Sequence, residues 1–460
     1  MTSLPARLVG DDLLMPCLDG TDRPYLSLDS AASTSALPAV ADRVTDFLPW
    51  YSSVHRGAGY KSQMATAAYE EARAAALAFA GRAGTDDIAI ICRNTTEAIN
   101  HLAYRLRLEP DDVVVTTVTE HHANLLPWAR LGCARRFVEC DRSGRFSVAD
   151  VIAVLDDGPR PRMLAVTGAT NVTGWLPPID DIIAAAHDRG VPVLVDGAQM
   201  AAHRPLPVAA DFLAWSGHKM YAPFGAGVLI GPRTAFTEGD PFLAGGGAVD
   251  LVDLDEVVWT DPPEREEAGS PNVIGAVALG AAMAELTAVG WPAITAHEHE
   301  LAGLLRAGLA AIPGVELLGP PLDEPTLAVA AFVVAEVPHA LVAARLAAEA
   351  GIGVRHGCFC AHPYLVRLLG LPPDEILRYR ADVLAGDRSR IPGAVRASAG
   401  ISVTVAEVQR FLDAVAAVAD GTPPPVTYRQ DAATGDFWPD GDDAPWSTGD
   451  RALGASCSRG

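Results

Sequence analysis

The chain has 460 residues, of which 49% are hydrophobic and 20% are charged, a composition typical of a globular protein large enough for two domains. Its formal net charge of −22 excludes the basic surface that a nucleic-acid-binding protein needs. No uncharged apolar stretch reaches the length of about 18 residues that predicts a membrane span, and the N-terminus lacks the layout of a signal peptide, so we expect a cytoplasmic protein.

Short apolar runs alternate with helical stretches between about residues 85 and 235. The run 88–91 is followed by a capped helix start at 95–100. The next elements in chain order are expected strands at 113–117 and 163–167, a helix at 178–187, and strands at 193–195 and 212–215. Continuous apolar strands separated by helices are typical of a mainly parallel sheet covered on both faces. We therefore predict an α/β fold.

Polar residues stand where ligands bind in such sheets, at the carboxyl ends of the strands. They are Thr95, His121, Asn171, Asp196 and Lys219. Lys219 lies between two apparent strands and is flanked by small, polar and histidine residues, which favours a lysine that forms a Schiff base with pyridoxal phosphate over a surface charge. Asp196 ends the strand before it, and an acid is the partner that a pyridinium nitrogen needs. These two residues predict a pyridoxal phosphate enzyme.

The C-terminal part of the chain predicts a smaller α+β domain and a tail. An alanine-rich helix from Val273 to about Ala288 is expected to join the two domains, and the smaller one contains a strand at 327–334 and a last helix at 405–418. After Gly421 the composition shifts to proline, aspartate, glycine and serine, which predicts a tail that is disordered or draped over the surface. The expected boundaries are 1–25 for an N-terminal segment, 26–289 for the large domain, 290–420 for the small domain and 421–460 for an acidic, flexible tail.

Short motifs follow one another in a fixed order over about residues 25 to 420. They lie at 28–32, 54–57, 93–97, 120–124, 170–174, 267–272 and 396–398, in addition to the segments around Asp196, Lys219 and Cys360. With these motifs the chain resembles the group II cysteine desulfurases and selenocysteine lyases of the class V aminotransferase family. The resemblance implies the fold-type I architecture of pyridoxal phosphate enzymes, with a mainly parallel seven-stranded sheet in the large domain.

The resemblance also implies a role for each matched residue. Lys219 would hold the cofactor covalently, His121 would stack on its ring and take part in catalysis, and Asp196 would keep the ring nitrogen protonated. The remaining cofactor contacts would come from Gln199 and Asn171, from Thr95, Ser216 and His218 at the phosphate, and from Ser270 of the partner subunit, whereas Arg396, Arg355, Asn171 and His55 would bind the substrate. The expected assembly is a homodimer with a small amino-acid substrate and no metal ligand.

Cys360 decides the expected reaction. In the desulfurases that the chain resembles, a cysteine followed by alanine and, one residue later, by proline forms a persulfide, and Cys360 has this place. Lys219 would take the α-proton of the substrate, and Cys360 would then take its sulfur, or selenium, and leave alanine. A sulfur-acceptor protein is then an expected partner. For Cys358 we expect a structural role, and relaying or resolving a persulfide is the alternative.

The chain departs from the family pattern in three places near this site. Cys358 and Phe359 replace the usual residues before the nucleophile, and about 36 residues separate Cys360 from Arg396, more than twice the usual spacing. The added segment, around 378–392, is expected to cover the active site, and the acidic tail has no counterpart. Asn94 also stands where the phosphate-binding turn usually has glycine. Alternatives are a C–S lyase, an epimerase or an aminotransferase on the same scaffold, or a non-enzymatic sulfur carrier or regulatory partner that has kept the fold.

Overall fold

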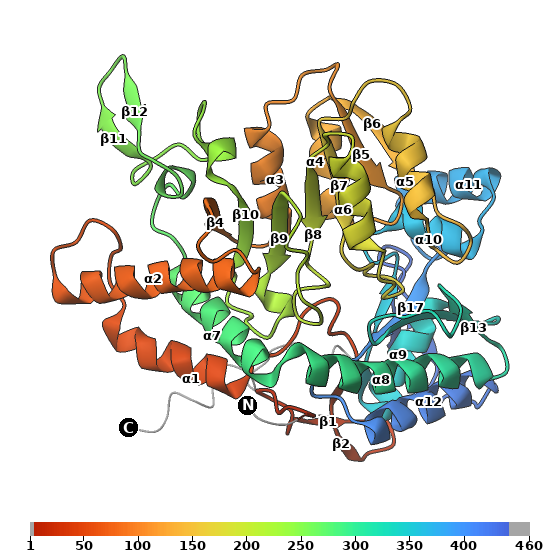
Figure 1. The fold of residues 1–460 in the computed structure, drawn as a ribbon. Coiled ribbons are helices and arrows are strands. Elements are labelled where there is room, and N and C mark those ends of the chain that lie inside the picture. Colours follow the sequence, from red (N-terminus) through yellow and green to blue (C-terminus); the bar gives the residue numbers. More distant parts are fainter. Residues whose placement is uncertain (1–3, 441–460) are drawn as a thin grey trace.

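A seven-stranded sheet forms the centre of the larger domain in the computed structural model, which describes residues 4–440 (Figure 1). The strands are, in chain order, β4 (Asp87–Cys92), β5 (Val113–Thr117), β6 (Ala134–Val138), β7 (Met163–Thr167), β8 (Val193–Asp196), β9 (Phe212–Ser216) and β10 (Gly227–Pro232). Their order across the sheet is β4-β10-β9-β8-β7-β5-β6, and β10 alone pairs antiparallel with its neighbours. The predicted mainly parallel sheet is confirmed.

Helices cover both faces of this sheet, which explains why its central strands are apolar throughout. Every residue of β5, β7, β8 and β9 is buried. Alternate side chains enter two separate cores because successive residues of a strand point to opposite faces. One core contains α3 (Thr95–Arg105) and α4 (Leu126–Arg130), and the other contains α1 (Pro38–Phe47), α2 (Tyr60–Phe79), α5 (Val148–Leu155), α6 (Ile179–His187) and α7 (Val273–Val289).

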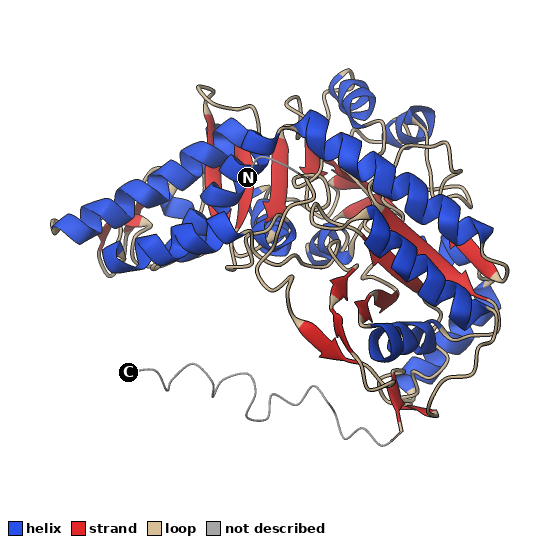
Figure 2. Cartoon of the chain, turned by 90° about the horizontal axis from the view of Figure 1, so that it is seen from below, coloured by secondary structure: helices blue, strands red, loops and turns tan. Residues whose placement is uncertain are grey.

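The smaller domain is built on an antiparallel four-stranded sheet. Its strands, in the order β13-β14-β17-β16, are β13 (Val315–Leu318), β14 (Val329–Val334), β17 (Ala394–Ser398) and β16 (Arg355–Gly357). Helices α8 (Trp291–Ala311), α9 (His339–Ala350) and α12 (Val405–Ala419) supply most of the remaining residues of its apolar core. In the view from below, helices lie across the strands in both parts of the chain (Figure 2).

The N-terminal strands belong to this smaller domain. After the β1–β2 hairpin (Leu14–Pro16 and Asp22–Pro24), β3 (Leu26–Ser27) pairs parallel with β15 (Ile352–Gly353). Leu26 and Leu28 are buried in the core of the small domain. Residues 26–28, which the sequence pattern places at the start of the large domain, therefore pack with the small one.

The added segment and the first half of the expected tail are folded together. Helices α10 (His362–Leu369) and α11 (Pro373–Leu384) follow the Cys360 turn, and residues 421–440 form a hairpin of β18 (Tyr428–Gln430) and β19 (Phe437–Pro439). The Arg388 N–H donates to the Ala432 carbonyl at 2.7 Å, and the Gln430 side chain donates to the Ser389 carbonyl at 2.9 Å. Of the two expectations for the tail, residues 421–440 follow the second and lie over the added segment, whereas 441–460 lie outside the described residues.

Among residues 4–440, no single helix is both long and apolar enough to span a membrane. Helices α7 and α8 meet the criterion of length and composition only when they are taken as a pair, and the pair is bent by 82°.

Candidate active site

A cavity of about 290 Å³ lies between the two domains, at the carboxyl ends of the strands of the large sheet. Of the residues expected at the site, it is lined by Thr95, His121, Asn171, Asp196, Gln199, Ser216, His218, Lys219, Arg355, Cys360 and Arg396. Three of these residues come from the small domain. Arg355 lies on β16, Cys360 lies just after β16, and Arg396 lies on β17. The structure thus brings together all the expected site residues except His55 and Ser270.

One end of the cavity is suited to an anion. Thr95 is the first residue of α3, and its N–H and hydroxyl lie 2.8 Å and 2.6 Å from Ser216 Oγ. The helix dipole favours negative charge at such an end, and two hydroxyls add hydrogen-bonding groups. Asn94 has extended backbone (φ −171°) and its side chain accepts from the Glu97 N–H at 3.0 Å, so the turn needs no glycine.

The other end of the cavity carries a buried acid. Asp196 ends β8, is 4% exposed and accepts the Ala198 N–H at 2.9 Å. Burial raises the pKa of this carboxyl, so it gains from a cationic partner. Gln199 donates one side-chain N–H to the Ala31 carbonyl at 2.7 Å, which leaves its second N–H for a ligand.

Lys219 stands in the 3-10 turn Gly217–Lys219, directly after β9. Gly217 has no room for a side chain, because a Cβ there would meet the Ala226 carbonyl oxygen at 2.9 Å. Burial lowers the pKa of Lys219 to about 8, although the Asp196 carboxylate opposes this shift. A large fraction of the amine is therefore neutral near pH 8, the form that reacts with an aldehyde.

His121 faces the same cavity as a neutral imidazole. Burial, together with the charge of Lys219, lowers its pKa to about 3. Its Nδ1 accepts the Ala123 N–H at 3.0 Å, so the ring proton is on Nε2. The side chain can therefore stack on a planar ligand without adding a positive charge to the site.

Two buried polar atoms at the side of the cavity have no hydrogen-bond partner. Arg396 donates from Nη1 to the Asn171 carbonyl at 2.9 Å and from Nη2 to Asp29 Oδ1 at 3.1 Å, but its Nε is free. Asn171 donates from Nδ2 to the Phe359 carbonyl at 2.7 Å, and its Oδ1 is free. An unpaired buried donor or acceptor costs about 1–3 kcal/mol, so one free donor and one free acceptor here are suited to a polar ligand.

Asp29 is a site residue to which the sequence assigned no role. Its two carboxylate oxygens accept from both arginines of the cavity, Arg396 Nη2 and Arg355 Nε, at 3.1 Å each. The carboxylate thereby fixes the direction of both guanidinium groups. Its place in the motif 28–32 could have indicated a role at the site. The two arginines that it contacts, however, lie more than 300 residues away from Asp29 in the chain.

Cys360 is presented on a strained turn. The Ala361 N–H donates to the Cys358 carbonyl at 2.9 Å, and the two central residues of this turn, Phe359 and Cys360, both have φ of +54°. This is the pattern of a type I′ turn, which favours glycine and asparagine, so each of these residues costs about 1–2 kcal/mol of strain. The large domain holds the strained turn in place, because the His122 N–H donates to the Cys360 carbonyl at 2.8 Å.

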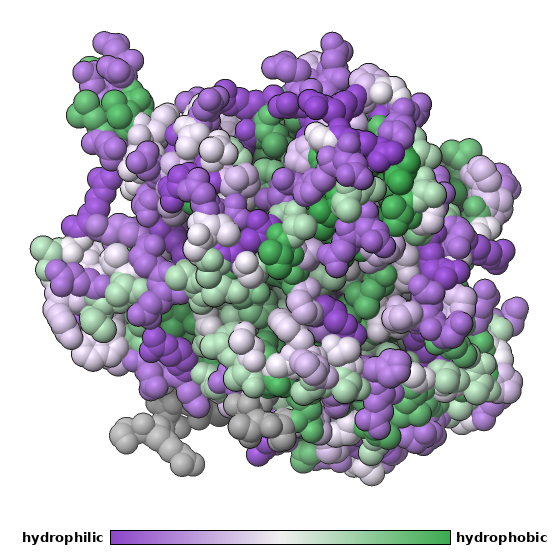
Figure 3. Space-filling model, in the orientation of Figure 1, coloured by the Kyte–Doolittle hydropathy of each residue, from purple (hydrophilic) through white to green (hydrophobic). Residues whose placement is uncertain are grey.

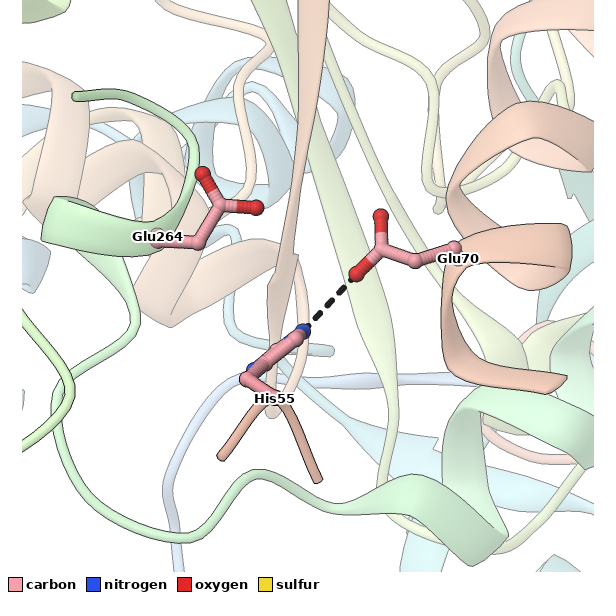
Figure 4. Close-up of side chains that lie close together, drawn as sticks. All are labelled: His55, Glu70 and Glu264. Atoms are coloured by element: carbon pink, nitrogen blue, oxygen red, sulfur yellow. Dashed lines mark hydrogen bonds and ion pairs between the residues drawn. The ribbon is translucent and has the colours of Figure 1, made fainter. Parts of the chain in front are cut away.

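His55 and Ser270 lie outside the cavity, and both are exposed. The His55 ring is 2.8 Å from Glu70 Oε1, with Glu264 nearby (Figure 4). Three possible ligand atoms of this group lie within 4.8 Å of one another. The Arg73 guanidinium already binds both carboxylates at 2.9 Å, so we assign no metal site to it.

Glu120 is a buried acid beneath the cavity. Its oxygens accept from the Thr117 hydroxyl at 2.8 Å, the Thr167 N–H at 3.0 Å and the Asn124 side chain at 2.8 Å. Burial raises its pKa to about 8. These bonds connect the segment before His121 to β7, so Glu120 positions one wall of the site.

Replacing Glu120 with glutamine is expected to remove part of the pH dependence of stability. Between the ordinary pKa of 4.5 and the folded-state pKa of about 8, the folded chain holds a proton that the unfolded chain loses. The free energy of unfolding of the parent therefore falls by a few kcal/mol as pH rises through this window. Urea unfolding at about pH 5 and about pH 8.5 measures the change, and Glu71→Gln, at an exposed position, is the control. Equal pH dependence in all three proteins would contradict the assignment.

The chain is similar to proteins of known family. The model of the family "Aminotransferase class-V" matches residues 26–411. A cysteine desulfurase from Dickeya dadantii is 41% identical over 362 residues, which are 76% of this chain and 86% of that protein. A probable cysteine desulfurase from Mycolicibacterium paratuberculosis is 36% identical over 410 residues, which are 87% of this chain and 56% of the longer relative. The apo structure of a cysteine desulfurase from Thermococcus onnurineus has a TM-score of 0.77 and 32% identity, and the match covers 86% of this chain and 95% of that one.

Proposed function

The chain belongs to the class V aminotransferase family, and on this premise we propose that it is a pyridoxal phosphate-dependent cysteine desulfurase-like enzyme. Its substrate is an L-cysteine-type amino acid, from which it removes sulfur or selenium and leaves alanine. The observation that carries the proposal is the position of Cys360, which lines the same cavity as Lys219 and Arg396.

The residues of the cavity fit the cofactor from one end to the other. The start of α3, with Thr95, Ser216 and His218, would bind the phosphate, and the buried Asp196 would pair with the ring nitrogen. Lys219 would hold the cofactor covalently, and His121 would stack on its ring. Pyridoxal phosphate, when bound, supplies an electron sink next to the α-carbon of the substrate.

The free polar atoms described above fit the substrate. Arg396 Nε and the guanidinium of Arg355 would bind the α-carboxylate, an anion that a planar donor group recognises. Lys219 Nζ, once released by the incoming amine, is the base that takes the α-proton, because burial keeps much of it neutral.

Cys360 would then break the carbon–sulfur bond. Its thiolate attacks the sulfur of the substrate, so that an S–S bond forms and the electron pair of the C–S bond remains with the carbon. The carbon takes up a proton and leaves as alanine, and the enzyme keeps the sulfur as a Cys360 persulfide. The overall balance is one cysteine and one thiol converted into one alanine and one persulfide, without an external oxidant.

Incubation of the purified protein with pyridoxal phosphate, L-cysteine and a reductant tests this function. We expect alanine and sulfide in equal amounts, because each turnover leaves one of each. Pyruvate and ammonia in place of alanine would instead indicate a C–S lyase, and D-cysteine an epimerase. A protein that binds the cofactor but converts no cysteine would overturn the proposal.

We also propose that the enzyme acts as a homodimer, and an exposed apolar hairpin supports this. The hairpin of β11 (Val249–Val252) and β12 (Val257–Trp259) projects from the large domain, and apolar residues lie just below its hydrophilic tip (Figure 3). Leu254 is 101% and Leu251 62% exposed, which is unusual for a surface that stays in water. Ser270 would then reach the cofactor of the partner, and light scattering should give twice the chain mass of 48.1 kDa.

A further inference from the structure

A second cavity, of about 670 Å³, lies on the other side of the Cys360 turn, and we refer to it as the outer cavity. Its walls include both thiols of the turn, the loop 388–393 of the added segment and the hairpin residues Gln430 and Gly435. Arg355, Phe359 and Cys360 line both this cavity and the active-site cavity, whereas Cys358 lines the outer one only. Cys360 therefore stands at the boundary between the active-site cavity and the outer cavity. The added segment covers that space, not the cofactor end of the site.

A single turn of the chain carries both thiols. Cys358 is its first residue and Cys360 its third, and the Ala361 N–H closes it on the Cys358 carbonyl at 2.9 Å. Only Phe359 separates the two cysteines, so the turn keeps their backbones next to each other. Both line one cavity, which gives them a common space in which to react.

Cys358 differs from the cysteines that only pack in the core. Cys17, Cys92 and Cys133 are buried, whereas Cys358 is partly exposed at the cavity wall. The Arg355 side chain, held by Asp29 at 3.1 Å, also faces this cavity. These surroundings suit a reacting thiol better than the structural role that the sequence favours.

We propose that Cys358 is a second sulfur carrier, which takes the sulfur from Cys360 in the outer cavity; this inference rests on the proposed desulfurase function. The Cys358 thiolate attacks the terminal sulfur of the Cys360 persulfide, and the S–S bond on Cys360 breaks as a new one forms on Cys358. Cys360 leaves as a thiolate and takes up the proton that Cys358 gave up, so nothing is oxidised or reduced overall. Cys360 is then free to react with another substrate molecule, while Cys358 carries the first sulfur as a persulfide in the outer cavity.

The test counts alanine formed by the holoenzyme with L-cysteine when no reductant is present. We expect about two alanines per subunit from the parent, about one from Cys358→Ser and none from Cys360→Ser, since each thiol stores one sulfur. Cys140→Ser is the matched control, because this half-buried thiol lines neither cavity, and it should give the value of the parent. Alkylation followed by fragment mass spectrometry should find sulfane sulfur on both Cys358 and Cys360 of the parent.

Several outcomes would overturn the relay and leave the desulfurase function intact. One alanine per subunit from the parent, with sulfur on Cys360 alone, would show that Cys358 accepts none. Two alanines from Cys358→Ser would place both sulfurs on Cys360, and a Cys358–Cys360 disulfide with free sulfide would make Cys358 a resolving thiol. The mass-spectrometric result on the parent decides the matter even if a variant fails to fold. No alanine from the parent, with or without reductant, would instead overturn the proposed function and the relay with it.

Discussion

Replacing Cys360 with alanine is expected to lower sulfide release from L-cysteine by at least about 1,000-fold, a loss of about 4 kcal/mol of transition-state stabilisation. Cys360 is the one cysteine that lines the active-site cavity, so among the described residues no other thiol can attack the substrate there. Its side chain is exposed, so the free energy of unfolding should change by no more than about 0.5 kcal/mol. Sulfide and alanine assays with a saturating reductant measure the effect.

A second variant at the same position separates chemistry from folding. Cys360→Gly is expected to be as inactive as the alanine variant but more stable than the parent by about 1 kcal/mol, because glycine adopts a φ of +54° without strain. Cys140→Ala, away from both cavities, should keep the activity of the parent. Unchanged turnover in Cys360→Ala would eliminate the persulfide mechanism.

The pocket was predictable because the fold brings the ends of its strands together. Continuous apolar runs such as 163–167 and 193–196 give a parallel sheet, and in a parallel sheet residues that follow different strands meet at one edge. Asp196 and Lys219 could therefore be assigned to one site from local patterns alone. Burial, which the same runs imply, also explains why both have shifted pKa values.

Other features depend on contacts that no local pattern records. Asp29 reaches the arginines from the N-terminal segment, and residues 421–440, polar enough to predict a free tail, are folded by bonds to the added segment. The position of Cys358 in a second cavity likewise depends on how 388–393 fold over the turn. His55 and Ser270 remain predictions, because one chain does not bring them to its own cavity.

Loss of Lys219 is expected to have the second large effect on activity. The role of this lysine can be tested directly because the chain has only two lysines, Lys61 and Lys219. Treatment of the parent with pyridoxal phosphate and then borohydride is expected to leave a covalent pyridoxyl group on Lys219 alone. The reason is that Lys219 lines the active-site cavity and that burial there lowers the pKa of its amine to about 8. Lys61, at the exposed start of α2, provides the matched control.

Lys219→Ala should therefore carry no pyridoxyl group, although Lys61 is still present, and it should lose at least about 10,000-fold in alanine formation. Lys61→Ala should be labelled and active like the parent. Peptide mass spectrometry locates the label, and amino-acid analysis measures the alanine. The loss should exceed that of Cys360→Ala. Lys219 Nζ is needed both for the covalent attachment of the cofactor and for the removal of the α-proton, whereas Cys360 acts only after these two steps. A labelled Lys219→Ala protein would place the cofactor elsewhere in the chain, and an unlabelled but active one would show that Lys219 is not the base.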